Sequence, residues 1–294
     1  MTKKIELYIF LFSIFFFGVI LFLFEEIFKN NFKNQFLLFV IPLLWPGIAH
    51  GSLDLYIAQR LKFIKSKKNL LMFSTLYLLV ALSFLLLWFI NSELSLFFFL
   101  LISIIHFGIS DTLNKKNAKF YNFEIFLRGS IPIVLPTVFY EKTTDSIFSI
   151  LSSENEFSKI VNEHIYVYFM ILILFFLKDL FSKKSFKKND YDQTLIEIFC
   201  IFVCFWSFEP LISFSLYFCF LHSIRHLNDE KNILKFSFLK LIKATLPLTF
   251  ITSFTIVFIY YFLKDFEYAY VSSLFIILSC LTLPHMILVS FSKT

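Results

Sequence analysis

The chain has 294 residues, of which 58% are hydrophobic and only 16% are charged, whereas a soluble domain carries about 25% charged residues. Its composition, which includes 46 phenylalanines, excludes a disordered chain, a collagen-like chain and a disulfide-dense secreted domain. A soluble globule of this size cannot hide so much apolar surface behind so few charges, so most of the chain is expected to lie in lipid.

Apolar stretches that suit membrane-spanning helices follow one another along the chain. The first follows Lys3 and Lys4; it is too long for a signal-peptide core and lacks a small-residue cleavage site, so we predict an uncleaved span. The fifth contains Pro132 and Pro136 and is expected to be kinked. The ten stretches are Ile5–Phe24, Phe36–Ala58, Leu70–Ile90, Leu94–Leu113, Phe123–Tyr140, His164–Leu180, Leu195–Phe208, Leu211–Leu227, Leu241–Phe262 and Tyr268–Ser290. The sequence therefore predicts an all-α fold, a polytopic membrane helix bundle of about ten transmembrane helices that forms a single integral membrane domain over residues 1–294.

The loops between these stretches alternate in charge. Lysine and arginine concentrate in Arg60–Asn69, in Asn114–Asn122 with Arg128 nearby, in Lys178–Gln193 and after His226, whereas the intervening loops carry mostly acids. The positive-inside rule places the basic loops and both termini in the cytoplasm, with the chain in the inner (plasma) membrane. Orientation thus explains the net charge of +6, and we expect no nucleic-acid partner.

Five of the six histidines lie inside predicted spans, where ionisable groups are costly and usually functional. They are His50, His106, His222, His226 and His285, each in the cytoplasmic half of an even-numbered span. His222 and His226 are four residues apart, so their imidazoles point the same way and suit two ligands on one metal. With His50 and His106 they make four neutral nitrogen ligands, a set that suits iron, copper, nickel or zinc rather than calcium or magnesium. The alternative is that these histidines are hydrogen-bonded structural residues, and for His285, beside Pro284, that is equally plausible.

Two similar segments bring carboxylates and glycines close to these histidines. Asp54 is four residues from His50 and is expected on the same face, where it would hold the second nitrogen of a ligand histidine. Asp111 is five residues from His106, about 140° around an ideal helix, and is expected to serve a neighbouring helix. Gly51 and Gly108 would let another backbone or a substrate come close.

Four segments in this order resemble the Brp/Blh family of bacterial and archaeal membrane β-carotene 15,15'-dioxygenases. They are His-Gly-x-x-Asp from His50, His-Phe-Gly-x-x-Asp from His106, Tyr-x-x-x-x-His-x-x-x-His from Tyr217 and Leu-Pro-His-Met from Leu283. The resemblance implies an iron(II) enzyme that splits the central double bond of β-carotene with O2 into two all-trans-retinal molecules, which commonly serve a microbial rhodopsin.

The resemblance also implies roles for particular residues. His50, His106, His222 and His226 would carry Fe(2+) in the cytoplasmic half of the membrane, with no catalytic residue beyond the metal centre. Asp54, Asp111 and His285 would surround the ligands. Candidates for lining an apolar substrate tunnel are Trp45, Tyr217, Gly51 and Gly108, and membrane lipid would hold the substrate.

Other functions fit the same residues less well. A metal-ion or proton-coupled transporter needs a polar pathway that reaches both sides of the membrane, whereas these histidines and aspartates gather in one half. A di-metal desaturase or hydroxylase needs about eight histidines, and a bis-histidine haem protein leaves His226 and the aspartates unexplained.

Overall fold

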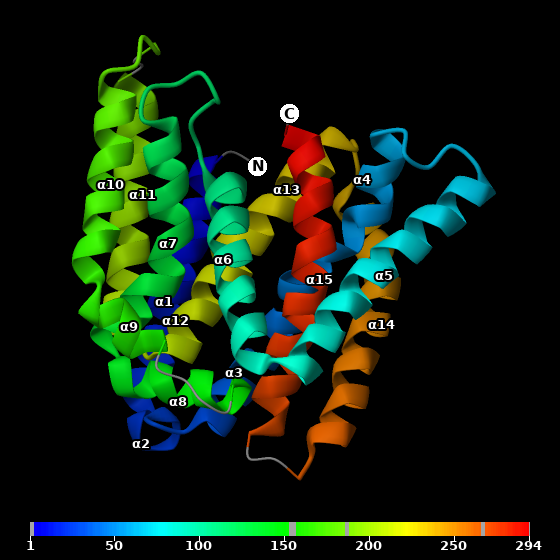
Figure 1. Cartoon of the computed structure of the whole chain (residues 1–294), viewed down its shortest axis with the longest axis horizontal. Helices are drawn as coiled ribbons and strands as arrows, with labels where there is room; N and C mark the ends of the chain where they lie inside the picture. The colour runs from blue at the N-terminus through cyan, green and yellow to red at the C-terminus, as the bar shows by residue number, and fades with distance from the viewer. Residues whose placement is uncertain (1–2, 153–156, 186–187, 266–267, 294) are drawn as a thin grey trace. The chain divides into compact units, whose positions relative to one another are not determined.

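A computed structural model describes residues 3–152, 157–185, 188–265 and 268–293 of the chain. The described residues are helical and contain no β-strand, only an isolated bridge between Ala118 and Ser185 (Figure 1). The predicted all-α class is therefore confirmed. The chain divides into two compact units, which are described in turn.

Unit 1 comprises Met1–Gln35, Ser103–Ser149 and Glu154–His222. In it, α7 packs against α10 and α11, and α1 packs against α11 and α12. Its helices are α1 (Lys3–Leu23), α2 (Glu25–Phe28), α7 (Tyr121–Phe139), α8 (Glu141–Leu151), α9 (Phe157–Glu163), α10 (Ile165–Leu180), α11 (Lys188–Ser207) and α12 (Pro210–Tyr217). Four segments run from one unit into the other: α3 (Phe32–Pro42), α6 (Ser92–Asp111), the end of α8, and η3 (Phe218–Ser223).

Two glycines let α6 and α7 approach each other closely within unit 1. A Cβ atom on Gly108 would collide with the carbonyl oxygen of Ile125, and one on Gly129 would collide with the carbonyl oxygen of Ile104. Small residues allow such close backbone contact between membrane helices. Gly108 therefore serves the approach of another backbone, one of the two roles expected for it.

Unit 2 comprises Phe36–Ile102, Ile150–Ser153 and Ser223–Thr294. Its α15 packs against α5 and α14, as Figure 1 shows. A buried core of Leu53, Ile57, Leu227, Leu241 and Leu288 joins its segments. Those segments are η1 (Leu43–Gly47), η2 (Ile48–Leu53), α4 (Asp54–Arg60), α5 (Lys67–Ile90), α13 (Ile224–Ile233), α14 (Phe238–Leu263) and α15 (Ala269–Lys293).

A salt bridge fixes α13 against α4 in unit 2. Arg60 Nη2 lies 3.1 Å from Glu230 Oε1 and 2.6 Å from Ser292 Oγ. Burial raises the pKa of the Glu230 carboxyl, and the Arg60 guanidinium opposes that rise.

Many large apolar side chains of the described residues lie on the surface, most of them on helices. Phe22, Ile90 and Phe181 are each 81% exposed. Apolar surfaces of this extent mark contact with a membrane rather than with water.

Six described helices are long and apolar enough to cross a membrane, or seven if the bent pair α7 and α8 forms one span. The six are Lys3–Leu23, Phe32–Arg60, Lys67–Ile90, Ser92–Asp111, Phe238–Leu263 and Ala269–Ser292, and each corresponds to a predicted span. The remaining predicted spans also fall on helices, but α10 has only 16 residues and the stretch from Leu211 is divided among α12, η3 and α13. The count of ten, the orientation of the termini and the single domain stay predictions.

Two of the helical stretches depart from α geometry. The stretch Phe32–Arg60 passes from α-helix through the π-helical η1 and the 3-10 helix η2 and back to α-helix. The break falls at Trp45, whose φ of −146° and ψ of 118° are extended, just before Pro46 and Gly47. The second departure is the π-helix η3, which joins α12 to α13. Such π segments often occur at functional sites. The π-helix η3 carries His222, and His50 lies on the 3-10 helix η2 that directly follows the π-helix η1.

Candidate metal centre

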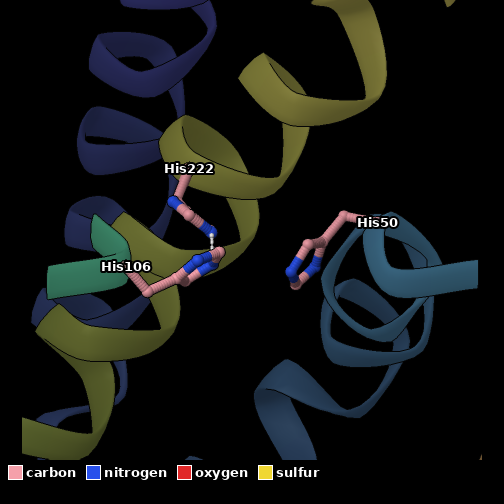
Figure 2. Close-up of side chains that lie close together, drawn as sticks. All are labelled: His50, His106 and His222. Carbon is pink, nitrogen blue, oxygen red and sulfur yellow. Dashed lines mark hydrogen bonds between the residues drawn. The ribbon is translucent and has the colours of Figure 1, made fainter. Parts of the chain in front are cut away.

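His106 and His222 of unit 1 face each other through their Nε2 atoms, 3.2 Å apart (Figure 2). Both side chains are buried, with exposed fractions of 4% and 0%. Two imidazoles bound to one metal at about 2.1 Å, with a ligand angle of about 90–110°, place their nitrogens about 3.0–3.4 Å apart. The spacing of this pair therefore fits two ligands of a single metal ion.

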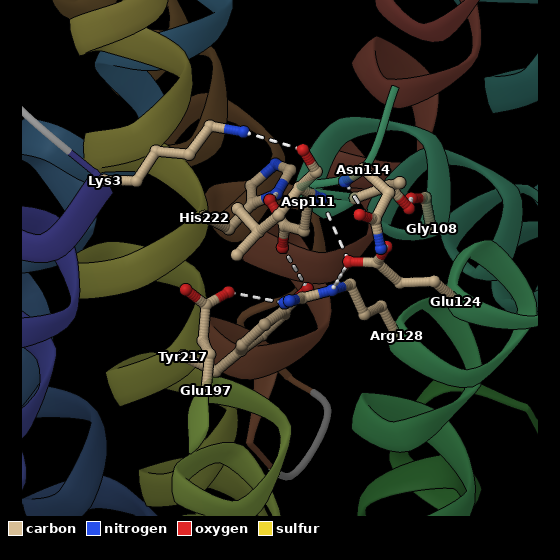
Figure 3. A network of polar contacts seen from close by, with 11 residues as sticks. Lys3, Gly108, Asp111, Asn114, Glu124, Arg128, Glu197, Tyr217 and His222 are labelled. Atoms are coloured by element: carbon tan, nitrogen blue, oxygen red, sulfur yellow. Dashed lines mark hydrogen bonds and ion pairs between the residues drawn. The ribbon is translucent and has the colours of Figure 1, made fainter. Parts of the chain in front are cut away.

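Asp111 fixes the orientation of His222. Its Oδ1 lies 3.2 Å from His222 Nδ1, and its Oδ2 accepts a hydrogen bond from the hydroxyl of Tyr217 (Figure 3). An ionised carboxylate can only accept hydrogen bonds, so His222 donates its Nδ1–H to Asp111 and presents Nε2 as its potential ligand atom. Asp111 thus contacts a helical segment other than its own, in line with the angle expected from its spacing to His106.

The π-helix explains how Tyr217 and His222 reach one carboxylate. In an α-helix, residues five apart point about 140° away from each other. In η3 the chain follows an i→i+5 pattern, which brings residues five apart close to the same face. Apolar rings surround the pair, with Phe107 at 4.8 Å and Phe218 at 5.9 Å from the His222 ring centroid.

A buried ionic network anchors the chain just after Asp111 (Figure 3). Glu124 accepts hydrogen bonds from the backbone N–H groups of Leu113 and Asn114. Arg128 donates from Nε to Glu124 over 2.7 Å and from Nη1 to Glu197. Because Arg128 is 1% exposed, it is a buried bridge between α7 and α11.

His50, His226 and His285 form a second group, within unit 2. Their ring centroids are separated by 5.6 Å (His50 to His226), 5.2 Å (His50 to His285) and 5.1 Å (His226 to His285). All three side chains are buried. His50 Nδ1 contacts the carbonyl oxygen of Gly47, which only accepts, so this nitrogen carries the proton and Nε2 is the potential ligand atom.

Asp54 orients His285 in this group. Its Oδ1 lies 2.7 Å from His285 Nδ1, and its Oδ2 accepts a hydrogen bond of 2.7 Å from the hydroxyl of Tyr77. The α-helical geometry assumed between His50 and Asp54 was wrong, because His50 lies on the 3-10 helix η2. In a 3-10 helix each residue advances by about 120°, so the four steps from His50 leave Asp54 roughly 120° away from it around the helix axis. In an α-helix the same four steps would leave the two residues only about 40° apart.

The four tunnel candidates occupy different environments. Tyr217 is fully buried and hydrogen-bonded to Asp111, and Gly108 lies against α7. A Cβ atom on Gly51 would meet nothing within 4 Å. Trp45 packs edge-on against Phe238, with ring centroids 6.0 Å apart.

Sequence reasoning missed Tyr77, Glu124 and Glu197, and it noted Arg128 only as a charge near a basic loop. The signal that could have found the ion network of Glu124, Arg128 and Glu197 is the rule already applied to the histidines, since ionisable side chains inside an apolar span need a partner. Glu124 and Arg128 are also spaced four residues apart, as an intrahelical ion pair requires.

Comparisons with known proteins add an independent result. A family model described as beta-carotene 15,15'-dioxygenase matches residues 41–293, a range that contains every candidate residue above. A beta-carotene 15,15'-dioxygenase from the uncultured marine bacterium 66A03 is 32% identical over 258 residues, which cover 83% of this chain and 89% of that protein. No solved structure matches the chain.

Proposed function

The chain belongs to the beta-carotene 15,15'-dioxygenase family, and we infer from this that it is a membrane dioxygenase that acts on β-carotene. The observation that carries the inference is the family match over residues 41–293. The apolar helices agree with it, because β-carotene is a hydrocarbon that dissolves in the membrane. The family match does not favour the transporter alternative.

We further propose that the cofactor is Fe(2+), held by His50, His106, His222 and His226. The first three are buried residues whose nitrogens could hold a metal ion. His222 and His226 lie one helical turn apart on the continuous stretch from η3 to α13, which begins in unit 1 and continues in unit 2. Neutral imidazoles suit iron, whereas hard oxygen ligands would suit calcium or magnesium.

Iron bound there would supply the chemistry with O2 that cleaves an alkene. The side chains of this protein have three tasks around it. Asp111 holds the proton of His222 on Nδ1 and keeps Nε2 available. Phe107 and Phe218 pack on the His222 ring and exclude water. The substrate has no polar group, so apolar walls must position its central double bond by shape; we propose Trp45, Tyr217, Gly51 and Gly108 among the residues that form or support them.

The products would be two molecules of all-trans-retinal, released into the membrane and passed to a microbial rhodopsin. The basic loops support an inner-membrane orientation with both termini and the metal centre on the cytoplasmic side. These points extend the family assignment and are part of the proposal.

Expression of the chain in bacterial cells that accumulate β-carotene tests the function. The orange colour should fade, retinal should appear at two molecules per β-carotene lost, and O2 should be consumed. Persistence of β-carotene beside folded, iron-loaded protein would refute the proposal. Metal-ion flux in liposomes without O2 consumption would support a transporter instead.

A further inference from the structure

His285 stands in unit 2 in the same relation to its surroundings as His222 does in unit 1. In each case the histidine Nδ1 meets an aspartate oxygen, at 2.7 Å for Asp54 and 3.2 Å for Asp111. In each case a tyrosine hydroxyl donates to the other oxygen of that aspartate, from Tyr77 and from Tyr217. An aspartate that receives both bonds fixes one tautomer and one ring orientation, an arrangement common behind metal-binding histidines.

The rings around His285 have the spacing of metal ligands. Imidazoles bound through nitrogen at about 2.1 Å place their ring centroids about 3.2 Å from the metal, so ligand angles of about 90–120° separate the centroids by about 4.6–5.6 Å. The observed separations of 5.2 Å to His50 and 5.1 Å to His226 lie within this range. The Nε2 atom of His285 is itself buried.

Burial of so many imidazoles supports a ligand role over a purely structural one. His285 is 3% exposed and Asp54 is 4% exposed. A histidine with a purely structural role does not require two other imidazoles in contact with its ring, whereas several ligands of one metal ion must lie this close together. The hydroxyl of Tyr77, which lies in the mostly apolar helix α5, also donates a hydrogen bond to Asp54 and holds it in place.

We propose that His285 is a further ligand of the metal, held for this role by Asp54 and Tyr77. The proposal rests on the proposed iron-dependent function. It assigns to unit 2 a set of three histidine ligands, His50, His226 and His285.

Metal binding by the purified, detergent-solubilised full-length protein tests the proposal. The affinity for Fe(2+) is measured by competition with a chelator, and the absorption spectrum of the Co(2+)-substituted protein reports the number and type of ligands. His285→Ala should weaken Fe(2+) binding by at least about 10-fold and change the Co(2+) spectrum. Added imidazole should restore part of the spectrum of His285→Gly, because it can enter the vacated position.

Asp54→Asn is the second variant, because it leaves the histidine in place and preserves shape. It should weaken Fe(2+) binding about 10–100-fold, the usual effect of losing the carboxylate behind a ligand. Two controls separate this from general damage. His164→Ala removes an exposed histidine, and Asp179→Asn removes a buried carboxylate that holds Asn122 in unit 1; neither should change the Co(2+) spectrum.

The outcomes separate the two proposals. A folded His285→Ala protein with wild-type affinity and spectrum overturns the ligand role, and if that variant does not fold, the same result for Asp54→Asn does so. A wild-type protein that binds no iron, or binds iron and leaves β-carotene intact, refutes the proposed function instead.

Discussion

The segments His50–Asp54 and His106–Asp111 have nearly the same sequence pattern and are built in different ways. His106 lies on the regular α-helix α6, where Gly108 brings α7 into backbone contact. His50 lies on the 3-10 helix η2, and the space beside Gly51 is open. Yet Asp54 and Asp111 each bind one histidine Nδ1 and one tyrosine hydroxyl. The two segments thus share a hydrogen-bonded group of one aspartate, one histidine and one tyrosine, although their backbone geometries differ.

The largest expected effect is the loss of a proposed ligand from either segment. His106→Ala and His50→Ala should each lower iron content and retinal production by more than the ~10–100-fold typical of losing an outer partner. Iron is measured per mole of purified protein, and retinal is measured by chromatography. If one variant keeps its iron and the other loses it, only one of the two segments belongs to the metal centre.

The next effect concerns the buried ion network that supports the His106 segment. Arg128→Ala should reduce the free energy of unfolding by about 3–5 kcal/mol, because it leaves Glu124 and Glu197 buried without their counter-charge. The comparison is Arg60→Ala in unit 2, where the arginine side chain is 24% exposed and only one carboxylate, that of Glu230, loses its counter-charge, so the loss should be smaller than for Arg128→Ala. Thermal or denaturant unfolding in detergent measures both. Equal losses would mean that the Arg128 network is no more important to stability than a partly exposed pair.

How far the sequence reaches can be judged from these same residues. The positions of the helices follow from apolar stretches, and the angle of Asp111 away from His106 follows from ordinary α-helical geometry. The pairing of Asp54 with His285 does not follow, because these residues are 231 positions apart and no local pattern links them. The 3-10 geometry at His50 and the π-helix at His222 were also missed, since both depend on tertiary packing that overrides the local period. The pairing of Arg128 with Glu197 does not follow either, because these two residues lie 69 positions apart on different helices.

The two glycines give a smaller and more selective effect. Gly108→Ala should destabilise the protein by about 1–3 kcal/mol, because its methyl group would collide with the Ile125 carbonyl and α6 would have to move from α7. Gly51→Ala should change the free energy of unfolding by less than about 0.5 kcal/mol, since the added methyl group meets no atom. Unfolding in detergent compares the two variants directly. A strongly destabilised Gly51→Ala protein would contradict the open space beside η2.

The smallest expected effect comes from removing the tyrosine hydroxyl from each aspartate. Tyr77→Phe and Tyr217→Phe keep the ring and delete one hydrogen bond, so each aspartate still holds its histidine through the other oxygen. A hydrogen bond to a charged group contributes about 1.5–3 kcal/mol, and only part of this should reach the metal, so iron affinity is expected to fall by less than about 10-fold in each variant. Chelator competition on both proteins measures the effect, with Tyr168→Phe as the control because the Tyr168 hydroxyl is hydrogen-bonded to Ser130. Similar losses of iron affinity for Tyr77→Phe and Tyr217→Phe would mean that the two aspartates support metal binding to the same extent despite their different backbones. A loss confined to Tyr217→Phe would restrict that support to unit 1, because Asp54 would then hold a histidine that the metal does not need.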